Sequence, residues 1–315
     1  MELRQLGQLD LWVSRLCYGS LPLGPLQLNL TPEQGGELLR HAFELGVNFV
    51  DTAEFYDNYS QIRWALEHWT GDVVVASKSY AYSSEWMAAS LEKARRELNR
   101  DVIDIFMLHE QESRLTLEGH RPALEYLLEA KTKGIVKAVG VSTHAVEVTA
   151  CAATMPEIDV IHPLINLEGL GIIDGSRQEM EQAIKAASGQ GKGIYAMKPL
   201  GGGNLLPRLE AAFNYMLDLP VINSIAVGMQ TPEEIEYNVL LFSKQDIPQK
   251  LAQAVKQRER YLKIADWCQG CGNCALHCPQ GALELKAGKM KVNEELCIFC
   301  GYCGAHCPEF CIKIF

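Results

Sequence analysis

The chain has 315 residues, of which 48% are hydrophobic and 22% charged, so it can bury one large core and still carry a small appended domain. Its formal net charge of −10 supplies no basic stripe for binding a phosphate backbone, so nucleic acid is not expected as a partner. No stretch is apolar for long enough to cross a bilayer, and Met1–Gly19 lacks the apolar core of a signal peptide, so we expect no membrane partner and a cytoplasmic protein.

The predicted secondary structure alternates short apolar runs with longer amphipathic stretches. Eight runs predict strands: Leu16–Gly19, Val47–Asp51, Val73–Ser77, Ile103–His109, Val136–Val141, Ile158–Ile165, Gly193–Lys198 and Ile222–Val227. The intervening stretches predict helices, among them Glu33–Leu45, Ser84–Leu98, Arg121–Lys133 and Gln178–Ala187. Strand and helix alternating eight times is the pattern of a (β/α)8 TIM barrel, an α/β fold that we assign to residues 1–262.

A doubly wound open sheet would also alternate strands and helices. The polar residues Asp51, Lys78 and His109 each stand at the end of a predicted strand. Barrel enzymes build their sites at these strand ends, so the placement favours the closed barrel over the open sheet.

The chain changes character after Leu241. Residues Gln245–Lys263 are rich in lysine and glutamine and predict a last barrel helix that runs into a connector. Residues 263–315 contain an internal repeat, each half being a cysteine loop followed by a short predicted strand. The tail therefore predicts a small ferredoxin-like α+β domain.

Eight of the eleven cysteines follow the spacing C-x2-C-x2-C-x3-C-P, which occurs twice in the tail. In bacterial two-cluster ferredoxins with this spacing, the fourth cysteine of each half ligates the other cluster. The spacing therefore predicts two [4Fe-4S] clusters. Their ligands are expected to be Cys268, Cys271, Cys274 and Cys307 for one cluster, and Cys297, Cys300, Cys303 and Cys278 for the other.

Structural zinc is the alternative for the cysteine tail, because zinc also binds at sites of four cysteines. Zinc ribbons use separated pairs of ligands, whereas this tail repeats three evenly spaced cysteines, a fourth and a proline. Glycines at 270, 272, 301 and 304 would let the backbone wrap a cluster and turn its amides toward sulfur. The remaining Cys17, Cys151 and Cys311 are expected to be packing residues.

Four polar residues at successive strand ends form a candidate catalytic group: Asp51, Tyr56, Lys78 and His109. Each alone has a structural explanation, as a helix cap, a rim aromatic, a surface charge or a satisfied core histidine. Together they resemble the aldo-keto reductase family. The resemblance spans nearly the whole barrel, through Asp51-Thr52-Ala53-x-x-Tyr56, Ala76-Ser77-Lys78, Leu108-His109, Gly140-Val141-Ser142, and Pro232-Glu233 with Asn238.

The four residues are suited to proton donation. A carbonyl that accepts hydride develops alkoxide charge, and a tyrosine with an ordinary pKa near 10 is a weak acid at neutral pH. We expect Lys78 to lower the pKa of Tyr56, Asp51 to hold Lys78, and His109 to donate a hydrogen bond to the carbonyl oxygen. Tyr56 is then the general acid in reduction and the base in oxidation.

The resemblance also implies a nicotinamide dinucleotide across the strand ends. Ser142 matches a position that contacts the carboxamide, His162 stands where a glutamine is usual, and Met197 replaces a stacking aromatic. Gly201 and Gly202 follow the seventh strand, where barrels commonly bind phosphate, and Lys198 and Arg208 are candidate basic contacts.

Cofactor choice is expected to depend on Glu234, beside Asn238. Its carboxylate would repel the 2′-phosphate of NADP and could accept a hydrogen bond from a ribose hydroxyl, so the sequence leans to NAD(H). The substrate is expected to be a small aldehyde, ketone or alcohol. Aromatic residues after the second and third strands predict either an apolar pocket or rim packing; they are Phe55, Tyr80, Tyr82 and Trp86.

Nicotinamide exchanges two electrons as hydride, whereas a four-iron cluster normally exchanges one. Three arrangements follow from combining the two halves. The barrel could be a working oxidoreductase whose clusters exchange electrons with a partner protein, such as a flavoprotein or ferredoxin. The chain could be mainly an electron-transfer module with the barrel as docking scaffold, or the clusters could be structural staples for a small domain.

Overall fold

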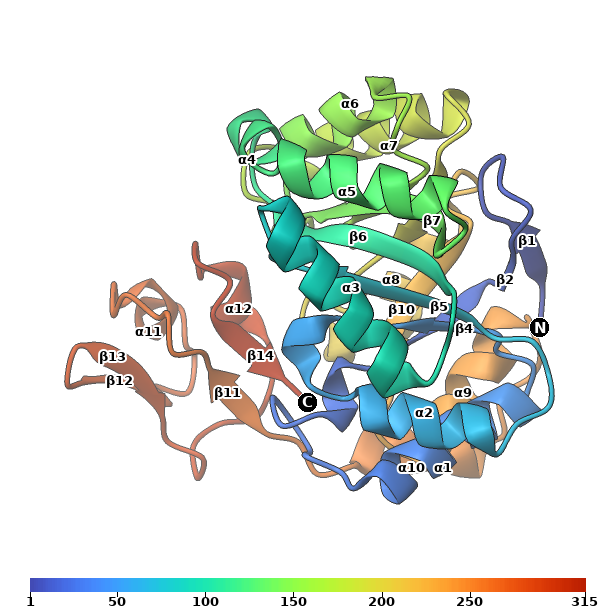
Figure 1. Cartoon of the computed structure of the whole chain (residues 1–315). Helices are drawn as coiled ribbons and strands as arrows, with labels where there is room; N and C mark the ends of the chain where they lie inside the picture. Colours follow the sequence, from blue (N-terminus) through green and yellow to red (C-terminus); the bar gives the residue numbers. More distant parts are fainter.

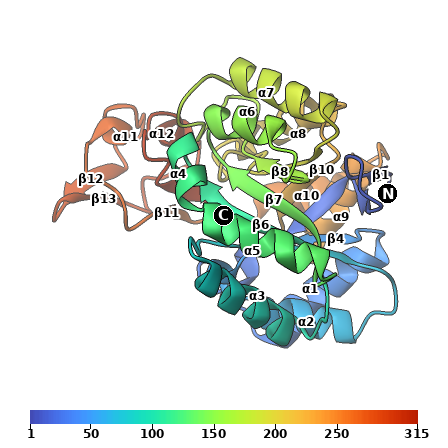
Figure 2. The same ribbon diagram turned by 45° about the horizontal axis from the view of Figure 1, so that its top comes forward.

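The computed structural model describes all 315 residues as a closed parallel barrel ringed by helices, with a small domain at one end (Figures 1 and 2). The barrel strands are β3 (Leu16–Gly19), β4 (Phe49–Asp51), β5 (Val74–Ser79), β6 (Ile103–Gln111), β7 (Val136–Thr143), β8 (Val160–Pro163), β9 (Gly193–Ala196) and β10 (Ser224–Gly228). Strand β10 pairs with both β9 and β3, which closes the sheet. The predicted barrel is confirmed, and the open sheet is excluded.

Helices cover the outside of the barrel. They are α1 (Pro32–Glu44), α2 (Tyr59–Glu67), α3 (Ser84–Leu98), α4 (Arg114–Gly119), α5 (Arg121–Thr132), α6 (Val146–Thr154), α7 (Arg177–Gly189), α8 (Leu209–Leu217), α9 (Pro232–Phe242) and α10 (Gln249–Gln257). Thr31 and Thr231 cap α1 and α9 through their side chains, each followed by a proline in the first turn. None of the helices combines the length and apolar character needed to span a bilayer.

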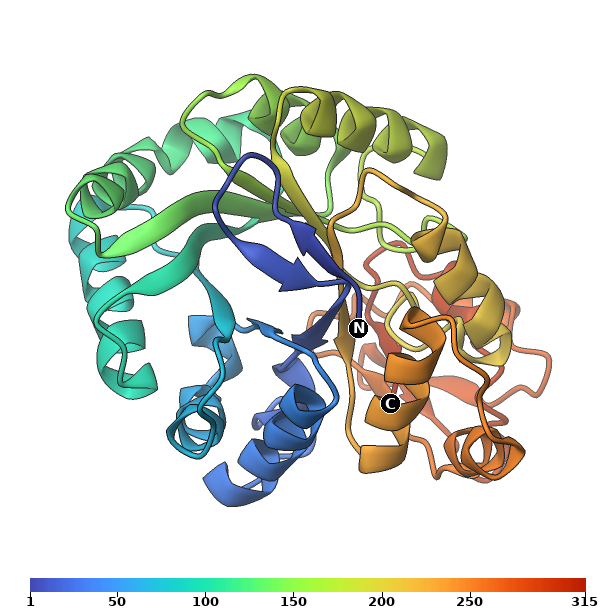
Figure 3. The ribbon, with the colours of Figure 1, turned by 90° about the vertical axis from the view of Figure 1, so that its right-hand side faces the viewer.

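Two apolar clusters form the core of the barrel. The larger contains 50 buried residues, drawn from strands and from helices α1 to α9. The smaller contains 13 buried residues, including inward-facing Phe49, Met107 and Tyr195. The hairpin of β1 (Leu3–Gln5) and β2 (Trp12–Ser14) crosses one end of the barrel, where Leu6 and Val13 join the smaller cluster (Figure 3).

The tail repeats one small unit twice. Its elements are β11 (Leu262–Ile264), α11 (Asn273–Leu276), β12 (Leu283–Lys286), β13 (Lys289–Val292), α12 (Tyr302–Ala305) and β14 (Ile312–Ile314). The short helices α11 and α12 follow glycines of matching left-handed conformation, Gly272 and Gly301, both with φ of 80°. The rings of His277 and His306, at equivalent positions, stack with centroids 3.6 Å apart.

The connector differs from the sequence prediction. Helix α10 covers only Gln249–Gln257, and the chain then extends into β11, which pairs antiparallel with β14. The predicted helix over Gln245–Lys263 is therefore wrong at both ends. Residues 262–264 belong instead to the tail, because their strand partner is the C-terminal strand.

Candidate functional site

A buried ion pair lies at the ends of β4 and β5. The ammonium group of Lys78 donates hydrogen bonds of 2.7 and 2.9 Å to the two carboxylate oxygens of Asp51 and one of 2.8 Å to the carbonyl of Thr52. Lys78 is 1% and Asp51 4% exposed. All three N–H donors of the lysine are therefore used, which fixes its position.

Tyr56 lies beside this ion pair on a 3-10 turn, Glu54–Tyr56, that follows β4. Its ring centroid is 5.0 Å from Nζ of Lys78. The turn is held in place by the carboxylate of Glu54, which accepts hydrogen bonds from the hydroxyls of Ser79 and Ser90 at 2.8 and 2.7 Å. The sequence motif therefore places the tyrosine next to the lysine, as expected.

The pKa of Tyr56 does not shift in the expected direction. Burial raises this pKa well above its ordinary value, and the charges of Asp51 and Glu110 act the same way. The N–H groups of Lys78 are directed at Asp51 and Thr52 rather than at the phenol. The net shift of the Tyr56 pKa is therefore upward rather than the expected downward one, and Tyr56 is held as a neutral phenol.

His109 forms the fourth part of the group. Its ring meets that of Tyr56 edge-on at 5.8 Å and stacks on Tyr80 at 4.2 Å. Burial, followed by the charge of Lys78, lowers the pKa of His109 well below its ordinary value, so the imidazole is neutral. Its Nδ1 is buried without a hydrogen-bond partner, so this ring has capacity left for a ligand.

Strand β6 presents His109 through an irregularity. The register between β6 and β7 shifts between Leu108 and Gln111, and Glu110 has a φ of 49°. The amide of Glu110 donates to the hydroxyl of Ser142 at 2.7 Å. A bulge at a barrel rim redirects the side chains near it, and here it lies beside His109.

Sequence reasoning missed a second tyrosine below the ion pair. Tyr195, on β9, donates a hydrogen bond of 2.9 Å to Asp51 and is fully buried. His162 stacks on its ring at 3.9 Å, donates through Nδ1 to the Tyr195 carbonyl at 2.6 Å, and lies 3.7 Å from Asp51. The alternation of β9 could have identified Tyr195 as inward-facing.

The predicted nicotinamide contacts lie in different surroundings. Ser142 is buried at the end of β7, and Met197, just beyond β9, is partly exposed. Both ring nitrogens of His162 are directed at Tyr195 and Asp51, in the barrel interior. Asn238 is buried on α9. Contact with the nicotinamide for Ser142, His162 and Met197, and with another part of the cofactor for Asn238, stays a prediction, with Ser142 and Met197 the better placed.

The glycine loop after β9 carries the cluster domain. The carbonyl of Gly202 accepts a hydrogen bond of 2.8 Å from the amide of Ile314, in β14. A side chain at Gly203 would collide with the carbonyl oxygen of Ile314, and the side-chain amide of Asn204 donates to the Ile312 carbonyl at 3.0 Å. These glycines therefore allow β14 to approach the loop closely, which phosphate binding alone would not require.

The amides of this loop are largely used within it. The N–H of Gly201 donates to Lys198, and that of Gly203 donates to Leu200. A phosphate placed here would find few free donors in the loop itself. The predicted role of Gly201 and Gly202 in cofactor binding thus stays a prediction, next to an observed role in domain docking.

Glu234 does not stand as an isolated carboxylate. It accepts hydrogen bonds from Arg258, just beyond α10, and from the amide of Gln230 at 2.9 Å. Arg258 also donates to the side chain of Gln230. No local pattern around Glu234 reveals this arginine, which lies 24 residues away in sequence. Arg208, which the sequence offers together with Lys198 as a basic contact for the cofactor, pairs with Glu168.

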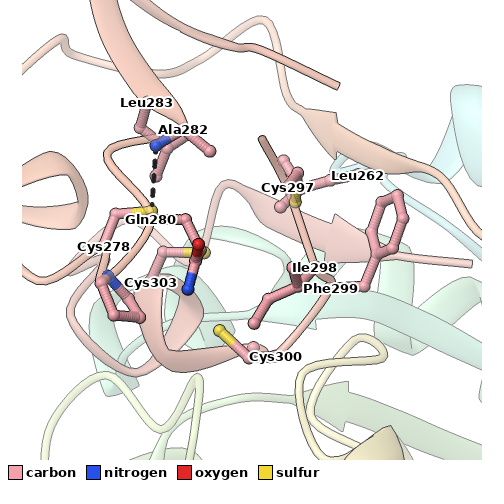
Figure 4. A pocket seen from close by; sticks show the side chains of 12 residues that line it. Leu262, Cys278, Gln280, Ala282, Leu283, Cys297, Ile298, Phe299, Cys300 and Cys303 are labelled. Atoms are coloured by element: carbon pink, nitrogen blue, oxygen red, sulfur yellow. Dashed lines mark hydrogen bonds between the residues drawn. The ribbon is translucent and has the colours of Figure 1, made fainter. Parts of the chain in front are cut away.

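The eight predicted cluster ligands lie close together in the tail, six of them in or beside one small apolar cluster. Cys278, Cys297, Cys300 and Cys303 line one cavity, so the fourth cysteine of the first half joins the second half (Figure 4). After burial, the neighbouring thiols of Cys307, Cys271 and Cys268 raise the pKa of Cys274, so these cysteines lie near one another, and their grouping as one ligand set stays a prediction. Backbone amides donate to the sulfurs of Cys268, Cys278 and Cys307 at 3.2 to 3.4 Å.

These cysteines fit a cluster better than a single zinc ion. No three histidine, cysteine or acidic side chains converge closely enough to hold one metal ion. A tetrahedral zinc would need four sulfurs about 2.3 Å from one point, whereas the repeated spacing of the eight cysteines matches the two-cluster ferredoxin pattern. Amide donors to sulfur are also a common feature of iron–sulfur sites.

Comparisons with known proteins agree with both parts. The family model "Aldo/keto reductase family" matches residues 15–210, and "4Fe-4S dicluster domain" matches residues 260–308. L-galactose dehydrogenase of Arabidopsis thaliana is 22% identical over 76% of this chain and 87% of its own length. Pyridoxine 4-dehydrogenase of Escherichia coli is 29% identical over 60% of this chain and 71% of its own length.

A solved structure shows the same fold. The holo form of aldo-keto reductase AKR11C1 from Bacillus halodurans superposes with a TM-score of 0.65 at 21% identity, covering 82% of this chain and 96% of the other. A parallel barrel with an ion pair and tyrosine at its strand ends defines a TIM-barrel oxidoreductase. The chain belongs to the aldo/keto reductase family and continues into a 4Fe-4S dicluster domain.

Proposed function

We propose that this protein interconverts a carbonyl compound and an alcohol at Tyr56, using a nicotinamide dinucleotide. The observation that carries the proposal is the Asp51–Lys78 ion pair, which lies next to the Tyr56 ring and a neutral His109. Family membership supports the same chemistry. A nicotinamide would supply hydride to the carbonyl carbon when bound.

The residues of the chain would supply the proton and the orientation. Tyr56, held as a neutral phenol, donates its proton to the oxygen as negative charge develops there. His109 donates a hydrogen bond to the same oxygen, because a neutral imidazole has one N–H. The raised pKa keeps Tyr56 in the protonated form that carbonyl reduction consumes, while the base form that oxidation requires is disfavoured.

The proposal covers both NAD(H) and NADP(H). The carboxylate of Glu234, taken alone, favours NAD(H). Because Arg258 pairs with that carboxylate, repulsion of a 2′-phosphate would be weaker than the sequence alone implies. NAD(H) is therefore the first cofactor to assay, with NADP(H) tested beside it.

We propose that the tail binds two [4Fe-4S] clusters and exchanges electrons with a cytoplasmic flavoprotein or ferredoxin. Large exposed apolar side chains are concentrated there, as expected for a surface that docks a partner. Seven of the fifteen in the whole chain lie in the last 55 residues; they are Tyr261, Trp267, Leu276, Leu285, Leu296, Ile298 and Tyr302. The ligand sets are those predicted from the spacing.

The second candidate is an electron-transfer module that uses the barrel as a scaffold. Docking of β14 on the Gly201–Gly203 loop favours it, because that loop is where barrels of this type commonly bind phosphate. An anaerobic stopped-flow mix with NADH or NADPH separates the two. Cluster bleaching by a nicotinamide alone supports communication between barrel and clusters, whereas bleaching only with a partner protein supports the module.

The decisive variant is Tyr56→Phe. We expect carbonyl reduction to fall by about 10²- to 10⁴-fold, because the general acid is lost, with no change in cluster absorbance. Tyr126→Phe is the matched control, because Tyr126 lies on the outer helix α5, away from the strand ends, and its hydroxyl makes no hydrogen bond in the structure. Undiminished turnover in Tyr56→Phe would refute the assignment.

A further inference from the structure

The mouth of the barrel has two chemically different sides. On the side of β5 and α3, four exposed aromatic rings lie at the rim; they are Phe55, Tyr80, Tyr82 and Trp86. On the side facing the cluster domain, three basic side chains come together from segments far apart in sequence: His144, Lys198 and Lys313. His109 lies between the sides, stacked on Tyr80.

The basic side spans the boundary between barrel and tail. Nζ of Lys198 is 2.8 Å from Nε2 of His144. Phe310, which precedes β14, lies close to both lysines: Nζ of Lys198 is 5.3 Å and Nζ of Lys313 3.0 Å from its ring centroid. Lys198 itself has a φ of 57°, a conformation that costs energy in a residue other than glycine and directs its side chain here.

Basic groups outnumber acidic ones at this boundary. Glu110 is the one carboxylate in the group; it lies 3.3 Å from His144 and accepts a hydrogen bond from Tyr80. Neither lysine forms a salt bridge, and Lys313 donates instead to the carbonyl of Phe310. Burial lowers the pKa of Lys198 to about 8, and burial with the charge of Lys198 lowers the pKa of Lys313 to about 6. At these values Lys198 is largely charged and Lys313 largely uncharged near pH 7, and a bound anion would raise both pKa values and favour the charged form of Lys313.

We propose that Lys198 and Lys313 form one oxyanion site across the boundary between barrel and cluster domain, and that it holds the carboxylate of an anionic carbonyl substrate. The proposal rests on the proposed function, because His109 and Tyr56 would act on the carbonyl of that substrate. The aromatic side would contact its apolar body. The tail would then complete the substrate site, which gives a physical reason for fusing it to the barrel.

A dinucleotide phosphate carries the same oxyanion chemistry, so the experiment must separate the two sources. Phenylpyruvate and phenylacetone are a matched pair, since the second replaces the carboxylate by a methyl group. Binding of each to the cluster-loaded protein is measured by anaerobic calorimetry without turnover, alongside binding of NADH and NADPH. The variants are Lys313→Met, Lys313→Arg as conservative rescue, and Lys291→Met as control.

Lys291 is a suitable control because it is an exposed tail lysine on the β12–β13 hairpin, which points away from the barrel (Figure 1). We expect Lys313→Met to weaken phenylpyruvate binding by about 10- to 100-fold, while phenylacetone binding and iron content do not change. Lys313→Arg should restore most of the affinity. Lys291→Met should bind like the wild type.

The remaining outcomes are also decisive. Weaker binding of NADH or NADPH, with phenylpyruvate unaffected, would support the oxyanion site but assign it to the cofactor. Unchanged binding of all ligands in Lys313→Met would overturn the site. The readout for the oxyanion site is binding, not turnover. If Lys313→Met weakens phenylpyruvate binding while Tyr56→Phe keeps full turnover, the proposed function is refuted and the oxyanion site still stands.

Discussion

The barrel and the tail are stabilised in different ways. The barrel buries one cluster of 50 residues and another of 13, and its polar site is a small exception within this apolar mass. The tail buries a cluster of only seven residues, of which Cys274 and Cys303 are two, with other cysteines at its edge. A core of that size cannot hold about 50 residues by apolar burial alone. In the barrel, structure and site are separable, whereas in the tail the same residues serve both.

Loss of one cluster ligand should therefore have the largest effect. In Cys307→Ala we expect iron to fall from about eight per chain toward four or fewer, because the first cluster loses a ligand. The tail should then lose protection from hydrogen exchange over residues 262–315, while the barrel helices keep theirs. Anaerobic iron assay and exchange mass spectrometry measure both.

Cys311→Ala provides the comparison for this variant. Cys311 is buried in the same segment, and its amide donates to the sulfur of Cys307, but it is not a predicted ligand. The Cys311→Ala variant should retain about eight irons per chain. Equal iron loss in both variants, or stoichiometric zinc in place of iron in the wild type, would contradict the ligand assignment.

A cavity in the barrel core should destabilise the barrel and leave the clusters intact, the reverse of losing a cluster ligand. Phe213, on α8, is fully buried and packs edge-on against Phe242 with centroids 5.4 Å apart. We expect Phe213→Ala to lower the free energy of unfolding by about 3–5 kcal/mol, with iron content unchanged. Denaturant unfolding followed by circular dichroism measures it, and a parallel loss of iron would show that the two regions do not unfold separately.

The fold was largely predictable because its signals are local. Each barrel strand is a short apolar run, and all eight were found, with ends differing by a few residues from β3 to β10. The cysteine spacing is also local and predicts both ligand sets. The helix over Gln245–Lys263 was wrong because its C-terminal part pairs with β14, and no local pattern reveals a partner about 50 residues away.

The site was predictable in part for the same reason. Asp51, Tyr56, Lys78 and His109 each stand in a recognisable motif at a strand end. Other groups were missed because they act through contacts between distant segments: Tyr195 on Asp51, Arg258 on Glu234, and Lys313 beside Lys198. The sign of the Tyr56 pKa shift was wrong because burial, which a motif does not encode, outweighs the nearby lysine.

Docking of the two regions can be tested at Gly203. This glycine has a φ of 88°, and any Cβ added to it would collide with the Ile314 carbonyl. Gly203→Ala should therefore separate β14 from the loop and cost about 1–3 kcal/mol of local strain. Gly134→Ala is the control, because Gly134 has a φ of 73° but open space around it. Faster hydrogen exchange at residues 201–204 and 312–315 is expected in Gly203→Ala alone, with iron retained; equal effects would argue against close docking.

The smallest expected effect is the pH dependence of barrel stability. Burial lowers the pKa of His162 to about 4, whereas in the unfolded chain it would be near 6.5. Between these values the unfolded state binds the extra proton, so acid favours unfolding. Stability should fall, as pH drops from about 6.5 to 4.5, by at most about 1.4 kcal/mol per pH unit for this histidine.

His162→Gln isolates this contribution from acid damage to the clusters, which both proteins share. We expect the variant to be less stable at about pH 7.5, because the stacking on Tyr195 is lost, and the difference from wild type to shrink steadily below about pH 6.5. Urea unfolding at several pH values under anaerobic conditions measures the difference. Parallel pH profiles for the two proteins would mean that His162 is not held neutral by burial, and that acid sensitivity arises in the tail rather than in the barrel.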